Sequence, residues 1–90
     1  MKVIKKDGRI QEFDIDKIKI TLGYVSDEVK QPLTFSDIDM VARKVERAVL
    51  ESNDNTIHSS DIQKIVLKEL KEAGFNYIAK RYDKYKKDFN

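Results

Sequence analysis

The chain has 90 residues and a formal net charge of +2, and 38% of its residues are charged. This length predicts one domain, residues 1–90, and excludes a separate catalytic domain. The absence of cysteine excludes a disulfide framework and a cysteine-ligated zinc site. No signal peptide is visible and no apolar run approaches the roughly 20 residues of a membrane helix, so we expect a cytoplasmic protein without membrane contact.

Basic residues gather at the two ends of the chain, while residues 21–74 are net acidic. If the fold brings the two ends together, they form one positive surface. Two kinds of function are compatible with such a surface. One is binding of a small anion, and the other is a small basic helical module that binds nucleic acid or a protein partner.

Residues 2–13 predict a β-hairpin, because Asp7-Gly8 lies between two short runs with β-branched and aromatic residues. A two-residue turn would place Lys6 opposite Arg9, and directly opposed cations weaken a ladder. An anion such as phosphate would explain so many cations near one turn. In the expected register Lys5 lies opposite Ile10 on the neighbouring strand. Val3 and Ile10 then lie on one face of the hairpin, and Ile4 and Phe13 lie on the other face.

Four helices are predicted after the hairpin. Their expected bounds are about 15–25, 37–51, 60–73 and 76–88, from apolar residues at helical spacing. Asp14 or Asp16 is expected to cap the first helix, and Ser36 with Asp39 forms the expected capping box of the second. Ser59 or Ser60 is expected to cap the third helix, where Ser60 and Gln63 also fit a capping box. Gly74 is expected to end the third helix. The fold class is therefore α+β and mostly α, with a hairpin lid over a four-helix bundle. The pattern does not support a third strand.

Aromatic residues of the last helix can be read in two ways. Tyr77, Tyr82 and Tyr85 could stack on bases, but their helical spacing with Ile78 favours core positions. A second apolar group could be an interface or loop packing: Tyr24, Val25 and Phe35.

Catalytic residues are not apparent. His58, the single histidine, falls where a loop meets a helix, and a surface position is its better interpretation. There is no G-x-x-x-x-G-K-[ST] phosphate loop and no convincing Ser-His-Asp set. We therefore expect neither enzyme activity nor a metal site made of side chains.

Phosphate binding must come from side chains and helix N-termini. Lys5 and Lys6 are one source, although composition alone slightly favours a solvated basic edge. Ser59 is a second source, because free amides at a helix start attract anions, and ordinary capping is compatible with this role. Lys86, on the basic last helix, is a third source, with a solvated face as its alternative.

Three segments resemble the ATP-cone, a regulatory nucleotide-binding module at the N-terminus of many ribonucleotide reductases. They read V-I-K-K-D-G-R-x-x-x-F-D-x-x-K-I, I-x-S-S-x-I-Q and A-K-R-Y-x-x-Y-K, and they follow one another in the family's order. The resemblance covers essentially the whole chain. Zinc-ribbon repressors also carry this cone, but the cysteines of their ribbon are absent here.

The resemblance implies roles for individual residues. Phosphate contacts are implied for Lys5, Lys6, Ser59 and Lys86, and nucleotide contacts for Val3, Gln11, Asp14, Lys17, Ile18, Ile62 and Gln63. Gln11 stands where the family has an acidic residue; its carbonyl can still accept from adenine N6 while its amide donates to a ring nitrogen. Lys6 stands where arginine is more common and acts as a point charge. Core packing is the alternative for Val3 and Ile18, and helix capping for Asp14.

The implied function is allosteric: binding of ATP or dATP without hydrolysis, with one or two nucleotides per domain and Mg²⁺ shared by their phosphates. In the family, ATP favours activity and dATP suppresses it through subunit association. The implied partners are adenine nucleotides, a ribonucleotide reductase catalytic domain or subunit, and further copies of the chain in a nucleotide-dependent homo-oligomer; nucleic acid is not expected. A small hydrolase is a further alternative, which phosphate release from ATP would reveal.

Overall fold

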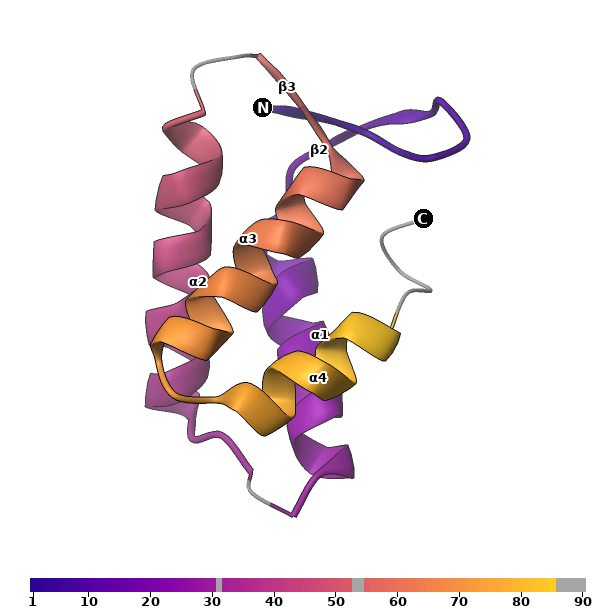
Figure 1. The fold of residues 1–90 in the computed structure, drawn as a ribbon. Helices are drawn as coiled ribbons and strands as arrows, with labels where there is room; N and C mark the ends of the chain where they lie inside the picture. Colours follow the sequence, from indigo (N-terminus) through magenta and orange to yellow (C-terminus); the bar gives the residue numbers. More distant parts are fainter. Residues whose placement is uncertain (31, 53–54, 86–90) are drawn as a thin grey trace.

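The computed structural model describes residues 1–30, 32–52 and 55–85 (Figure 1). These residues form a mostly helical α+β fold with four helices and a small three-stranded sheet. The strands are β1 (Lys2–Ile4), β2 (Ile10–Glu12) and β3 (Thr56–His58), and the helices are α1 (Ile15–Glu28), α2 (Phe35–Leu50), α3 (Ser59–Glu72) and α4 (Asn76–Lys84). Figure 1 shows the sheet across one end of the helices. None of the helices in these ranges has the length and hydrophobicity that crossing a membrane requires.

The core lies between the helices and the inner face of the sheet. The side chains that are almost fully buried come from every helix and from β1 and β3: Val3, Ile18, Leu22, Val25, Val41, Val45, Val49, Ile57, Ile62, Val66, Leu70, Ile78 and Tyr82. Val25 was expected in an interface or in loop packing, which is wrong, because it lies on the buried stripe of α1. Its expected neighbours Tyr24 and Phe35 are exposed.

The aromatic residues of α4 divide between core and surface. Tyr82 is fully buried, whereas Tyr77 is 71% exposed, so the expectation that Tyr77 is a core residue is wrong. Tyr77 precedes the buried pair Ile78 and Ala79 and lies on the opposite side of this nine-residue helix. The helix was expected to run to residue 88, but residues 86–90 lie outside the described ranges.

Helix starts follow from local capping. The Asp14 side chain accepts from the backbone N–H of Asp16 (3.0 Å), which confirms Asp14 as the cap of α1. The cap of α2 is Thr34, not Ser36: Thr34 Oγ1 accepts from Asp37 N (3.1 Å), and Asp37 Oδ2 accepts from Thr34 N (3.0 Å). Both positions match the same capping pattern, so the sequence alone did not distinguish them.

The ends of α3 differ in their capping. Its N-cap residue is His58, which makes no side-chain capping bond, so the expected caps at Ser59 or Ser60 are wrong. The cause is β3, which runs directly into the helix. At the other end Gly74 has a φ of +86° and donates its N–H to Lys71 O (3.0 Å), which confirms the expected glycine cap.

The cap of α2 gives a testable prediction. Thr34→Ala removes one half of the capping box and should lower the free energy of unfolding by about 1 kcal/mol. Ser36→Ala, two residues further on at an exposed position, should change it by less than about 0.5 kcal/mol. Urea unfolding of both variants measures the difference. A larger loss for Ser36→Ala would mean that the helix is capped there in solution.

Candidate functional site

The hairpin turn has three residues, not two. Gly8 N donates to Lys5 O (2.9 Å), Lys5 N donates to Arg9 O (2.8 Å), and Gly8 has a φ of +87°. This is a type I turn followed by a left-handed glycine, the usual three-residue hairpin loop. Lys5 therefore lies opposite Arg9, and the expected pairings of Lys6 with Arg9 and of Lys5 with Ile10 are wrong.

Asp7 holds this turn together. Its Oδ1 accepts from the backbone N–H of Arg9 (3.1 Å) and its Oδ2 from Arg9 Nε (2.7 Å). The backbone hydrogen bond is the largest cause that lowers the pKa of Asp7 below its ordinary 3.8, and the Arg9 side chain adds to it. Arg9 is thus engaged with Asp7, and the turn presents Lys5 and Lys6 as its other cations.

The longer turn also changes the faces of the hairpin. The paired residues are Val3 with Gln11 and Ile4 with Ile10, because a shift of one residue exchanges the two faces of a strand. The expected faces, Val3 with Ile10 and Ile4 with Phe13, are wrong. Val3 is 8% exposed and faces the helices, so Gln11 lies on this inner face as well.

The third strand, β3, was not predicted. It pairs in parallel with β1, with Val3 beside Ile57 and Ile4 beside His58. Its three residues have one apolar member, which is too short a pattern to distinguish from a loop. The strand matters for the site because the next residue after His58, Ser59, comes level with Lys5.

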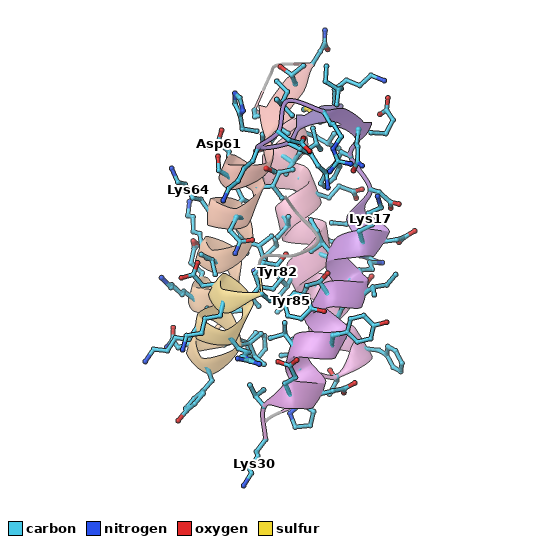
Figure 2. The ribbon with its side chains drawn as sticks, turned by 90° about the vertical axis from the view of Figure 1, so that its right-hand side faces the viewer. Lys17, Lys30, Asp61, Lys64, Tyr82 and Tyr85 are labelled. Atoms are coloured by element: carbon cyan, nitrogen blue, oxygen red, sulfur yellow. The ribbon has the colours of Figure 1, made fainter. Side chains whose placement is uncertain are left out.

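A pocket lies between the inner face of the sheet and the first turns of α1 and α3. Its cavity volume is about 40 Å³. It is therefore a narrow cleft rather than an open chamber. Figure 2 shows the hairpin at one end of the helices, with Lys17 on α1 to one side and Asp61 on α3 to the other.

Most residues that the resemblance implies line this pocket: Val3, Lys5, Gln11, Asp14, Lys17, Ile18, Ser59 and Ile62. Glu12 and Phe13 also line it and were not predicted, although they stand in the same segment of sequence. Lys6 is exposed at the turn and Gln63 lies on α3, both outside the lining. Lys86 lies outside the described residues.

The pocket has a positive end near the turn. Lys5, the first residue after β1, lines it, and so does Ser59, which is only 4% exposed and is the first residue of α3. The N-cap residue of α3 provides no side-chain acceptor, so the first amides of the helix are available to an anion at the positive end of the helix dipole. This end suits phosphate or another oxyanion.

The other end of the pocket is apolar with a polar edge. Val3, Ile18 and Ile62 are each less than 10% exposed and form the wall. Gln11, opposite Val3 on β2, supplies an amide at the edge of this wall. A flat ring with polar atoms on its rim suits this end.

Two other polar residues of the site are engaged within the chain. Glu12 is bonded to Lys2, and this side-chain hydrogen bond is the main cause that lowers the pKa of Glu12 below 4.5. Gln63 Nε2 donates to the carbonyl of Tyr82 (3.4 Å), and its buried Oε1 has no partner in the described part of the chain. Gln63 therefore joins α3 to α4 beside the pocket.

The fold and the pocket define a small domain with a cleft, which has a positive end and an apolar wall. A family model described as the ATP cone domain matches residues 1–88. The chain belongs to this family, which confirms the resemblance seen in the sequence. ATP-cone domains bind adenine nucleotides and are regulatory, and this chain is a regulatory domain rather than an enzyme.

Among curated proteins the chain is similar to the transcriptional repressor NrdR of Streptococcus pneumoniae. Sequences from strains Hungary19A-6, 70585 and R6 are each 37% identical to it over 70 residues, which is 78% of this chain and 43% of the relative. The chain thus spans less than half the length of these relatives. Because they are named repressors of transcription, the expectation of a ribonucleotide reductase subunit as partner and of no link to nucleic acid is wrong.

Proposed function

We propose that this domain senses nucleotides by binding ATP or dATP in the pocket beneath the hairpin, without hydrolysing them. The observation that carries the proposal is the combination of a cation and an uncapped helix N-terminus with an apolar wall in one cleft. The family supports binding of adenine nucleotides in general. The choice between ATP and dATP, and the residues that contact them, are part of the proposal.

The phosphates are proposed to lie at the positive end. Lys5 and the first amides of α3 at Ser59 approach them from two sides, and Lys17 adds a cation from α1. Lys6 contributes positive charge from the tip of the turn, outside the lining. Charge-assisted hydrogen bonds of this kind are roughly twice as strong as neutral ones, so they fix the phosphates in place.

The base is proposed to lie against Val3, Ile18 and Ile62, with Gln11 at its polar edge. Asp14 borders the same region, while its Oδ1 also holds the start of α1. The cleft is narrow, and we propose that the hairpin moves outward to admit a purine ring. We therefore propose that the hairpin acts as a lid.

Mg²⁺ is proposed to accompany the triphosphate. The described residues contain no group of three or more His, Cys, Asp or Glu side chains placed to hold a metal ion. Mg²⁺ commonly keeps several waters and binds through substrate phosphates, which suits a site without a protein cage. We propose one or two nucleotides per domain, and the titration described below measures this number.

The regulatory output is proposed to be control of transcription, because the relatives are named transcriptional repressors. ATP and dATP differ only in the ribose 2′-hydroxyl, so this group has to produce different affinities for two states of the whole protein. A cytoplasmic location agrees with this proposal, since both nucleotides and DNA are present there. Direct contact with DNA is the second candidate function and would show itself as affinity that falls steeply with salt.

Calorimetric titration of the chain with ATP and dATP in Mg²⁺ tests the proposal. Both nucleotides should bind saturably, without phosphate release, and Lys5→Ala should weaken binding about tenfold or more, because a charged hydrogen bond contributes about 1.5–3 kcal/mol. Lys64→Ala removes the same charge from an exposed position of α3 outside the lining and should leave the affinity unchanged. No saturable binding of either nucleotide would refute the proposal.

A further inference from the structure

Three lysines form a stripe along the outer face of α3. Lys64, Lys68 and Lys71 are exposed, and their spacing along the chain places them on one side of the helix. The buried residues of this helix lie on its opposite face: Ser59, Ile62, Val66 and Leu70. The lysine stripe therefore points away from the core.

The acidic residues of α3 lie on a different side of the helix from this stripe. Gln63 marks the side that faces α4, because its Nε2 donates to the carbonyl of Tyr82 (3.4 Å). At about 3.6 residues per turn, the side opposite Gln63 carries Asp61, Glu69 and Glu72. The lysines lie between that acidic side and α4, so positive charge is gathered on the outer face.

Helix α4 continues the positive surface. It packs against α3, and Figure 1 shows these two helices in front of α1 and α2. Lys80 and Lys84 are exposed and one turn apart, opposite the buried Tyr82. Arg81 is directed to α1 instead, where its Nε donates to Glu28 Oε2 (2.6 Å). The exposed face of α4 thus adds two lysines to the three of α3.

The charge of these five lysines is not neutralised by neighbouring carboxylates. None of the five takes part in an ion pair within residues 1–30, 32–52 and 55–85, whereas Arg43 is paired with Asp39 (3.0 Å) and Arg9 with Asp7 (2.7 Å). Like charges three or four residues apart on a helix destabilise it slightly. A partner that carries a row of negative charges would remove this cost.

We propose that the lysine face, formed by Lys64, Lys68 and Lys71 of α3 with Lys80 and Lys84 of α4, binds the phosphate backbone of duplex DNA. Seven residues of helix rise about 10 Å, and duplex DNA carries about six phosphate charges over that length. Each lysine of the stripe therefore has a phosphate within reach. Backbone contacts need positive charge but no groups that read bases, which suits a face of lysines.

This inference rests on the control of transcription proposed above and names a surface for contact with DNA. The lysine face is separate from the nucleotide pocket, because none of its five residues lines that pocket. Binding of DNA and binding of ATP can therefore be measured independently on the same chain.

Fluorescence anisotropy of a short labelled duplex DNA of mixed sequence tests the inference on the intact chain. Wild-type affinity should fall steeply between about 50 and 200 mM salt, because bound phosphates release counterions. A variant with Lys64→Gln, Lys68→Gln and Lys71→Gln should lose about 2 to 3 units from the slope of log affinity against log salt, since each phosphate contact contributes about 0.9. At the lower salt concentration it should bind DNA about tenfold more weakly or worse.

The matched control combines Lys30→Gln, Lys44→Gln and Arg47→Gln. It removes the same number of exposed cations outside the lysine face, so the two variants have the same net charge. Its slope should change by less than about 0.5. Equal losses of slope in the two variants would overturn the inference, and so would a wild-type chain that binds poly-glutamate but not DNA.

Titration with ATP separates this inference from the proposed function. Both variants should be folded by circular dichroism and bind ATP with wild-type affinity, because their substitutions lie outside the pocket lining. A wild-type chain that binds ATP but not DNA would overturn the inference and leave nucleotide sensing standing. Failure of the wild-type chain to bind ATP would instead refute the proposed function.

Discussion

Ser59→Asp should lower the affinity for ATP by a hundredfold or more. Ser59 is the first residue of α3, is 4% exposed and lines the pocket, so the new carboxylate would lie where the phosphates are proposed to bind. Two unit charges about 4 Å apart repel by roughly 4 kcal/mol at an effective dielectric constant near 20, and every 1.4 kcal/mol is about tenfold in affinity. Calorimetric titration with ATP measures the loss.

The control for this prediction is the neighbouring residue. Ser60→Asp adds the same charge to the same helical turn, but Ser60 is exposed and is not part of the lining. In both variants the new carboxylate lies in the first turn of α3, where a negative charge interacts favourably with the helix dipole. Both variants should therefore remain folded, which circular dichroism checks. Ser60→Asp should change affinity by less than about threefold. A folded Ser59→Asp protein with wild-type affinity would show that phosphates do not bind at this helix start.

Local signals in the sequence predicted the existence of the main elements. Asp7-Gly8 indicated a hairpin, and apolar spacing indicated four helices, because these patterns depend on near neighbours along the chain. The type of turn did not follow, since Asp-Gly favours a two-residue loop but its glycine can also take the left-handed position of a three-residue loop. That one residue of difference reversed the faces of the hairpin and placed Gln11 beside Val3.

Many of the residues that the resemblance implies lie around one pocket, and their contacts with a nucleotide stay a prediction; the geometry that brings them together was not predicted. No local pattern marks Thr56–His58 as a strand, because β3 exists only through its pairing with β1. This pairing is what brings Ser59 level with Lys5. Glu12 ends β2 and Phe13 follows it, and both line the pocket where the chain approaches α1.

The expected protein partner was wrong for a different reason. Residues such as Lys5 and Ser59 are proposed to contact the ligand, and nothing in them specifies which protein responds to it. A ribonucleotide reductase subunit was inferred from where such domains are often found, whereas the relatives of this chain are named transcriptional repressors. The residues of a sensor's binding site therefore do not identify the process that the sensor regulates.

Tyr82→Ala should lower the free energy of unfolding by about 3–5 kcal/mol, which is typical for truncating a buried aromatic side chain. The Tyr82 side chain is fully buried in the core, whereas the bond from Gln63 Nε2 goes to its backbone carbonyl and is kept in the variant, so the loss comes from the side chain. Domains of this size have a total stability of about 5–15 kcal/mol, so this loss is a large fraction. Urea unfolding followed by circular dichroism measures it.

Tyr77→Ala makes the same substitution on the same helix at a side chain that is 71% exposed, and it should change stability by less than about 0.5 kcal/mol. Because neither tyrosine lines the pocket, ATP at 100 times its dissociation constant should stabilise both variants by about 2.7 kcal/mol. Equal losses in the two variants would contradict the burial of Tyr82. A Tyr82→Ala protein that is folded but not stabilised by ATP would mean that α4 helps to shape the nucleotide pocket.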